Sequence, residues 1–276
     1  MTRASGSIQE IWRFPVKSMQ GESLQEAAIS GNGLSGDRAY GLLDVATGTI
    51  ASAKKLRLFP DLMRCHAAFV ASPQAGGTLP PVAIRLPDGR RVRSDDAATD
   101  QILSDYFERE LRLVPAPAGI YTYKHYSMAS ARSEMPGKAA SGALRDAQPM
   151  SMLTTSTLAR LQELQPDSQF DARRFRMNVI IATEGSGFVE NDWLGHDFML
   201  GRSARLTVTH HDPRCVMVTL AQDGLALDPS ILQTIRRHNG LVIDDSRKRP
   251  CAGVYAAVAV PGMVRVGDLL AQTTAA

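Results

Sequence analysis

The sequence has 276 residues, of which 44% are apolar and 21% charged, and its formal net charge is +3. These values are typical of a globular chain with one large domain or two smaller ones. They do not favour a nucleic-acid partner, which requires a basic stripe with interleaved aromatic residues. No apolar run reaches the roughly 18 residues of a membrane-spanning helix, and the N-terminus has no apolar signal segment. The 3 cysteines have irregular spacing and do not form a disulfide framework. We therefore expect a cytoplasmic protein with reduced thiols and no membrane partner.

The first part of the chain is expected to form short strands joined by turns. Apolar residues recur at period two up to Pro15, and a Pro-Asp-Gly turn at residues 87–89 separates two further apolar runs. The turn is typical of a β-hairpin. The predicted strands cover residues 8–16, 38–45, 82–86 and 91–93.

A helix and a long loop follow these strands. Thr99 is a candidate N-cap, and the apolar residues Ile102, Leu103 and Phe107 lie at helical spacing. Residues 127–148 are rich in Ser, Ala, Gly and charge and lack periodicity, so they are expected to form a loop. Loops of this length are usually lids or disordered segments, and the sequence does not decide whether this one is a lid.

The second half alternates strands with two helices. A helix is predicted over residues 153–164, with hydroxyl side chains in its first turn, and a second helix opens at Asp228 and Pro229. The predicted strands cover residues 177–183, 197–200, 205–210, 215–220, 254–260 and 264–266. Many short strands with few helices favour a mostly β, α+β fold, built as a barrel or as packed sheets.

Two motifs suggest a dinucleotide-binding site and a zinc site, but their sequence context favours neither. Residues 31–36 match G-x-G-x-x-G, but the next residues resemble a strand, whereas a dinucleotide site requires a helix there. His210, His211 and Cys215 are close in sequence, but adjacent strand residues point to opposite faces and no paired ligand motif is present. The sequence does not exclude a cysteine activated by a histidine, as in a Cys–His protease, but it contains no local signature of one. Cys65 is expected to be a buried thiol.

Cys215 is the candidate for chemistry because of its surroundings. Pro213 ends the preceding strand and Arg214 places a permanent cation beside the sulfur. A neighbouring guanidinium lowers the pKa of a thiol and favours the thiolate, which is the form that attacks electrophiles or binds metal.

Several groups suited to an anion are spread along the chain. The hydroxyl cluster opens a predicted helix, where backbone N–H groups and the helix dipole favour a phosphate. The candidate residues are Lys17, Ser18, Arg38, Thr154, Thr155, Ser156, Thr157, Arg173, Arg174, Arg176 and Asn178. A solvated basic face explains any one of them; together with Cys215 they suggest an anionic cofactor whose metal is held by sulfur.

These segments resemble a known family, the MOSC-domain proteins. The early runs are similar to its N-terminal β-barrel module, and the later ones to its core entry, its cysteine motif and its closing strands. The similar runs are residues 14–18, 36–38, 174–180, 190–193, 213–215, 253–255 and 266–268. The resemblance spans nearly the whole chain in the expected order. It implies an N-terminal β-barrel-like domain over residues 1–125 and a MOSC domain with a β-barrel fold over residues 126–276.

The resemblance also implies a molybdenum cofactor, Mo-molybdopterin, and chemistry independent of pyridoxal phosphate. Carried over by position, Cys215 would bind molybdenum, Arg214 would keep its sulfur ionised and Asp192 would orient the site. The residues that would hold the pterin and its phosphate are Lys17, Ser18, Arg38, Thr154, Thr155, Ser156, Arg176, Asn178 and Arg214. Characterised relatives, the amidoxime-reducing components, reduce N-hydroxylated small molecules.

Departures from the family pattern leave alternatives open. Met177 stands where the family commonly has proline, and the cysteines are too few for an iron–sulfur cluster. A separate electron-transfer protein of the ferredoxin or flavoprotein reductase type is therefore expected. The alternative function is sulfur transfer or cofactor carriage through a Cys215 persulfide, with Cys251 as a buried packing thiol or a relay. A third class is a non-catalytic β-barrel module that binds another phosphorylated ligand.

Overall fold

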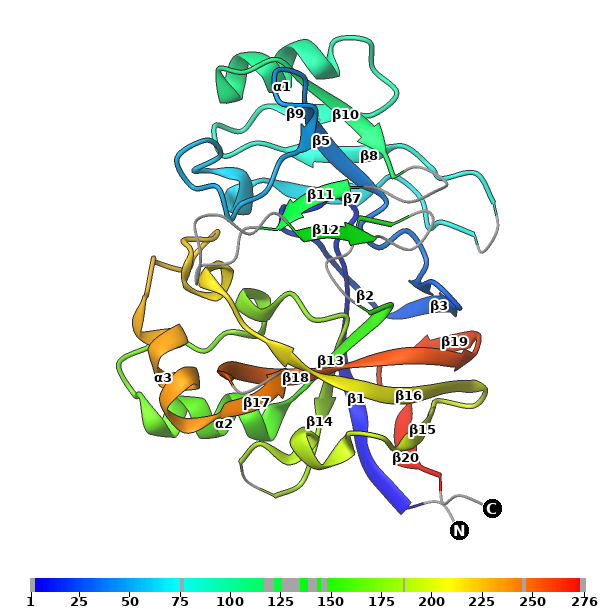
Figure 1. Cartoon of the computed structure of the whole chain (residues 1–276). Helices are drawn as coiled ribbons and strands as arrows, with labels where there is room; N and C mark the ends of the chain where they lie inside the picture. Colours follow the sequence, from blue (N-terminus) through cyan, green and yellow to red (C-terminus); the bar gives the residue numbers. More distant parts are fainter. Residues whose placement is uncertain are drawn as a thin grey trace. The chain divides into compact units, whose positions relative to one another are not determined.

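The computed structural model describes residues 3–74, 77–116, 122–125, 135–138, 143–144, 148–185, 187–244 and 247–273 (Figure 1). The chain forms two compact units. The first contains residues 1–12, 23–35 and 148–276, and the second contains residues 13–22 and 36–147. Neither unit is one continuous stretch, so this division differs from the predicted segments 1–125 and 126–276. The N-terminal strand belongs with the C-terminal half of the chain.

The first unit is built around a closed ring of 7 strands. In ring order they are β13 (Met150–Thr154), β14 (Val179–Ala182), β1 (Arg3–Arg13), β20 (Leu269–Gln272), β15 (Asp197–Leu200), β16 (Ala204–Pro213) and β18 (Arg247–Val260). The ring closes because β18 pairs with β13. Only β13 and β14 run parallel, and α2 (Thr155–Leu164) lies between them in sequence. The predicted mostly β fold with a barrel is confirmed.

Successive side chains along the strands of the ring point alternately into two different buried clusters. Met152, Ile181 and Val254 belong to the core enclosed by the ring. Their sequence neighbours Leu153 and Ile180 belong to a second cluster with residues of α2 and α3 (Ser230–His238). Because successive strand residues point to opposite faces, these strands are buried on both sides. Figure 1 shows α2 and α3 together along one side of the ring.

The other elements of the first unit flank the ring. A small sheet contains β19, β3 and β4, and β17 pairs with β18. Their bounds are β3 (Glu26–Ser30), β4 (Gly33–Leu34), β17 (Gly240–Asp244) and β19 (Gly262–Arg265); β2 (Glu22–Leu24) lies where the units meet in sequence. Three short 3-10 helices, which carry much of the candidate site, are η2 (Ala172–Phe175), η3 (Val189–Trp193) and η4 (Val216–Thr219).

The second unit consists of small antiparallel sheets and one helix. The sheets are β10-β5-β6, β7-β8-β9 and β11-β12. Their strands are β5 (Tyr40–Asp44), β6 (Thr49–Ile50), β7 (His66–Phe69), β8 (Val82–Arg85), β9 (Arg91–Arg93), β10 (Leu111–Pro115), β11 (Thr122–His125) and β12 (Met135–Lys138). The helices are α1 (Thr99–Phe107) and η1 (Leu62–Arg64). Buried side chains such as Phe59, Leu62, Ile84 and Leu103 form the core.

The structure corrects several predicted elements. The predicted strand at residues 215–220 is the 3-10 helix η4, and α2 begins at Thr155 because the residues before it belong to β13. Thr99 is the first residue of α1 rather than its N-cap, and its hydroxyl donates to the carbonyl of Arg93. The hairpin of β8 and β9 is confirmed.

The predicted loop at residues 127–148 is partly replaced by a strand. β12 lies inside it and pairs with β11. The other residues of this segment, except 143–144 and 148, lie outside the described residues. Whether the segment forms a lid is therefore not decided by the described residues. In the part of the chain that the structure describes, no helix has the length and apolar character needed to span a membrane.

Candidate functional site

Cys215 lies at the point where β16 has ended and η4 begins. Its backbone is extended, with φ −126° and ψ −175°. Cys65 and Cys251 are buried, whereas Cys215 is partly exposed. Among the three cysteines, Cys215 is therefore the one with access to a bound group. Cys251 is fully enclosed and its thiol donates to the carbonyl of Arg249 at 3.4 Å, which favours a packing role over a sulfur relay.

The neighbouring Arg214 fixes this turn through both its backbone and its side chain. Its backbone N–H donates to the carbonyl of Pro250 at 2.7 Å. Its guanidinium forms an ion pair with Asp212 and donates to the carbonyl of Phe175 and, at 3.4 Å, to the sulfur of Met177. The guanidinium carbon also lies 5.5 Å from the centre of the Phe175 ring.

These contacts change the expected role of Arg214. Its charge is matched by the buried carboxylate of Asp212, so less of its field is available to the neighbouring sulfur. The sequence alone predicted a permanent cation beside the thiol and gave no partner for it. In the structure Arg214 mainly holds the Cys215 turn against η2, and its effect on the ionisation of the sulfur stays a prediction.

Arg176 is held by the same contacts. It follows η2 in a left-handed conformation, with φ 54°, and only 8% of its surface is exposed. Arg214 contacts the residue on each side of it, Phe175 and Met177. The structure thus links the Cys215 turn to the segment that carries Arg176, although these residues are far apart in the sequence.

Backbone strain marks the predicted cofactor residues. Among the described residues, the non-glycine residues with positive φ are Ser18 (65°), Arg38 (52°), Glu108 (52°) and Arg176 (54°). Glu108 ends α1 and Arg176 ends η2, and the end of a helix is a common place for this conformation. Ser18, Arg38 and Arg176 are residues for which the sequence predicted cofactor binding. Strained backbone of this kind tends to occur at ligand-binding and active sites, where the surrounding structure holds it in place.

Asn178 has a structural role at the start of β14. Its side-chain oxygen accepts from the backbone N–H and the hydroxyl of Ser151 at 3.3 and 3.1 Å, and its amide donates to the carbonyl of Trp12 at 3.4 Å. These bonds join β13, β14 and β1 at one end of the ring. Its predicted role with the cofactor stays a prediction.

The hydroxyl cluster binds a carboxylate of the chain itself. Glu190, which is fully buried, accepts hydrogen bonds from the hydroxyls of Thr154 and Thr157 at 2.6 and 2.7 Å and from the backbone N–H of Gly253 at 3.1 Å. Thr154 also caps α2 by accepting from the N–H of Thr157. The helix N-terminus predicted to hold a phosphate therefore faces Glu190. Burial raises the pKa of Glu190 above its usual value, while the hydroxyl and backbone donors lower it to a smaller extent.

The other hydroxyls of the cluster also have partners in the chain. Ser156 donates to the carbonyl of Gly187 at 2.9 Å, and the hydroxyl of Thr155 accepts from the N–H of Thr183 at 3.2 Å. These contacts attach the start of α2 to the segment before η3. The phosphate-binding role of Thr154, Thr155 and Ser156 stays a prediction, and these contacts do not favour it.

Sequence reasoning selected Asp192 in η3 and missed Glu190. Asp192 is exposed, whereas Glu190 and Trp193 are buried. In a 3-10 helix residues i and i+3 share a face, so Glu190 faces inward together with the aromatic ring. The three-residue spacing from Trp193 was the signal in the sequence. The role of Asp192 in orienting the site stays a prediction.

The predicted residues of the second unit gather around one short segment. The Lys17 ammonium donates to the carbonyl of Leu144 at 3.0 Å, and the N–H of Leu144 donates to the carbonyl of Arg38 at 2.8 Å. Ser18 is buried next to Lys17. The structure thus brings Lys17, Ser18 and Arg38 together through the bridge between Val16 and Tyr40.

Arg38 is fixed by two neighbours. Its guanidinium pairs with the buried carboxylate of Asp37, which also accepts from the N–H of Phe14 at 3.0 Å. The guanidinium carbon lies 4.7 Å from the centre of the Phe14 ring, a distance suited to a cation–π contact. A rigid arginine with a strained backbone is suited to binding an anionic group.

The histidines and acidic residues of the described part of the chain do not suggest a metal site. No group of three or more His, Cys, Asp or Glu residues within the described residues could hold a metal ion. His211 has a lowered pKa, caused first by burial and then by the neighbouring His210, which favours its neutral form.

Two protein domain families match the chain. The family described as "MOSC N-terminal beta barrel domain" matches residues 5–102, and the one described as "MOSC domain" matches residues 139–271. The mitochondrial amidoxime-reducing component 1 of Mus musculus is 24% identical over 289 residues, covering 95% of this chain and 81% of that protein.

Solved structures give weaker similarities. The YUAD protein from Bacillus subtilis covers 100% of both chains with a TM-score of 0.47 and 9% identity. YiiM from Geobacillus stearothermophilus covers 57% of this chain and 74% of its own, with a TM-score of 0.33 and 16% identity.

Proposed function

The chain belongs to the MOSC-domain family, and from this premise we propose that it binds a molybdenum cofactor and uses it as an oxidoreductase. The observation that carries the proposal is the backbone strain at Ser18 and Arg38. Neither residue ends a helix, and a left-handed conformation costs each about 1 kcal/mol or more, which is typical of residues held in place at a ligand site.

The chemistry of the donor set fits such a cofactor. Cys215 is the partly exposed cysteine, and a thiolate is the soft ligand that a thiophilic metal prefers. The Nε atom of the adjacent Arg214 is buried and has no hydrogen-bond partner among the described residues. We propose that Arg176 supplies a cation of the kind that a pterin phosphate requires. The bound group would supply two-electron redox chemistry, while the chain binds, orients and shields it.

We propose that Cys215 binds the metal and that Arg214 positions it. The ion pair with Asp212 and the bond to Phe175 keep the guanidinium in one orientation, so the turn that carries the thiol has little freedom. Preorganised ligands of this kind lower the cost of binding and maintain the geometry during reaction. Lys17, Ser18 and Arg38 are proposed to bind the anionic part of the cofactor.

The proposed substrates are N-hydroxylated small molecules. Cleavage of an N–O bond consumes two electrons and two protons and releases water and the reduced nitrogen compound. The proposal follows the name of the amidoxime-reducing relative and the family match. We propose that the electrons come from a separate protein of the ferredoxin or flavoprotein reductase type.

The proposal is tested by metal and pterin analysis of protein purified from a host that makes the cofactor and is supplied with molybdate. We expect about one molybdenum and one pterin per chain in the wild type, and loss of molybdenum in Cys215→Ala. Cys65→Ala is the matched control, because Cys65 is a buried thiol in the second unit. Reduction of an N-hydroxylated amidine by a chemical electron donor then tests the activity.

Two results would contradict the proposal. Wild-type protein that contains neither metal nor pterin would exclude a resident cofactor. Cyanide-labile sulfur on Cys215 without molybdenum would instead support the sulfur-transfer alternative. Equal loss of molybdenum in Cys65→Ala would indicate a general effect on folding rather than loss of a ligand.

A further inference from the structure

A row of basic side chains crosses one sheet of the second unit, away in sequence from every predicted cofactor residue. In β7-β8-β9, His66 lies directly opposite Arg85, and Arg85 lies directly opposite Arg91. Directly opposite residues of antiparallel strands project from the same face, with β-carbons about 5 Å apart. We call His66, Arg85 and Arg91 the basic row.

Two members of the basic row, Arg85 and Arg91, are arginines that lie directly opposite each other. Like charges directly opposite each other destabilise a sheet, and an arginine keeps its charge at every ordinary pH. Arg93, on the same face of β9, pairs with Asp95 at 2.9 Å. Arg91 forms no ion pair with an acid within the described ranges. The guanidinium of Arg91 is therefore available to an anionic ligand.

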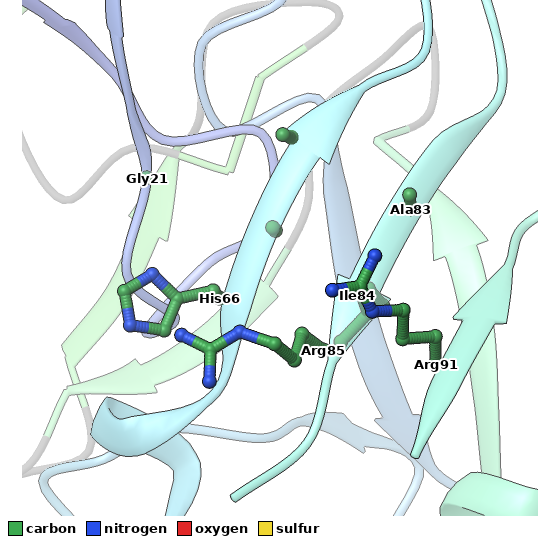
Figure 2. A pocket seen from close by; sticks show the side chains of 8 residues that line it. Gly21, His66, Ala83, Ile84, Arg85 and Arg91 are labelled. Carbon is green, nitrogen blue, oxygen red and sulfur yellow. The ribbon is translucent and has the colours of Figure 1, made fainter. Parts of the chain in front are cut away.

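A shallow pocket lies beside the basic row. Its volume is about 260 Å³, and the three basic residues line it together with Ala68 and Ala83 (Figure 2). The two alanines lie two residues along β7 and β8 from His66 and Arg85, so they belong to the same face. Their small side chains leave an apolar floor next to the charges. Figure 2 shows the His66 ring and the Arg85 guanidinium next to each other, with Arg91 on the following strand.

The size and chemistry of this pocket indicate the class of ligand. Ligand pockets usually range from about 300 to 1,000 Å³, so this one has room for a small molecule only. The guanidinium fork matches the oxygens of a carboxylate or phosphate group. An anion held between two guanidiniums would also remove the repulsion within the basic row.

We propose that the basic row binds a small molecule with a carboxylate or phosphate group, held by Arg85 and Arg91, and a short apolar body that contacts Ala68 and Ala83. The proposal is independent of the molybdenum cofactor, because it concerns other residues and another ligand.

The test is a titration of the full chain with inorganic phosphate and with butyrate at constant ionic strength, followed by calorimetry or NMR. We expect saturable binding of at least one of these anions to the wild type. Arg91→Ala should weaken it about tenfold, as expected for loss of a charge-assisted hydrogen bond. Arg93→Ala, the matched control on the same strand and face, should leave it unchanged.

A second variant tests the pocket itself. Ala83→Leu fills the apolar floor on the exposed face without removing a charge, and it should abolish binding of butyrate while leaving the melting temperature nearly unchanged. The ligand should also raise the melting temperature of the wild type but not that of Arg91→Ala, because only a ligand that binds the folded state stabilises it.

Three results would overturn the proposal. The first is that neither anion saturates the wild type at millimolar concentration. The second is that Arg93→Ala weakens binding as much as Arg91→Ala, which would indicate general charge attraction. The third is that only poly-glutamate binds, which would make the basic row a docking surface for an acidic protein instead.

Discussion

Arg214 donates a hydrogen bond from its guanidinium to the sulfur of Met177, with 3.4 Å between the two atoms. The contact joins the residue that precedes Cys215 to the residue that follows Arg176. A thioether is a weak acceptor, so this bond contributes orientation more than energy. The side chain of Met177 is therefore part of the support of the Cys215 turn.

Met177→Leu is predicted to loosen this turn without unfolding the protein. Leucine keeps nearly the same volume, so the stability should fall by less than about 1.5 kcal/mol. The sulfur acceptor is lost, and Cys215 should become more reactive toward iodoacetamide, as measured by mass spectrometry of the alkylated peptide. Met150→Leu, in the core of the same ring, is the control. If both variants change the reactivity of Cys215 equally, the Arg214 contact is not the cause.

Gly253→Ala is predicted to destabilise the first unit strongly. Gly253 has φ +85°, and an added β-carbon would lie 2.3 Å from the terminal carbon of Met177 and 2.6 Å from the carbonyl oxygen of Met152. Strain and overpacking together should lower the free energy of unfolding by about 2–4 kcal/mol, as measured by chemical denaturation.

The matched control for that substitution is Gly187→Ala. Gly187 has φ +94° but nothing within 4 Å of an added β-carbon, so only the backbone strain of about 1–2 kcal/mol is expected. Equal losses for the two variants would show that packing around Gly253 contributes nothing.

Glu190→Gln is predicted to flatten the pH dependence of stability. Because burial raises the pKa of Glu190 in the folded state, the folded protein binds more protons than the unfolded chain above the usual carboxyl pKa. The free energy of unfolding of the wild type should therefore fall as the pH rises from that value through the raised pKa. Glutamine does not titrate and lacks this slope. Denaturation at several pH values measures it, with the exposed Asp192→Asn as a control that should keep the wild-type profile.

Ser18→Gly is predicted to separate stability from cofactor binding. Glycine adopts the positive φ of this position without strain, so stability should rise by about 0.5–1 kcal/mol while the pterin content of purified protein falls. Glu108→Gly relieves the same conformation at the end of α1, where no ligand is expected. It should stabilise the protein and leave the pterin content unchanged. An unchanged pterin content in Ser18→Gly would contradict the proposed role of Ser18.

Much of the fold follows from local patterns in the sequence. The alternation of apolar residues and the turn at residues 87–89 predicted the hairpin of β8 and β9, because both signals act between neighbouring residues. Many short strands with few helices predicted a barrel or packed sheets. The Pro-Arg-Cys run selected Cys215, and the structure shows that it is the partly exposed cysteine.

The contacts of the site required the tertiary structure. Three features of the site depend on residues that are far apart in the chain. They are the acid of η3 that faces inward, the residues that Arg214 contacts and the strands that close the ring. Glu190 meets Thr154 and Gly253 only because β13 and β18 pair, and β1 joins the ring although it begins the sequence. The sequence by itself determined which residues can do chemistry, since that is a property of side chains. The tertiary structure decided which of their charges are already matched, since pairing depends on distance and burial.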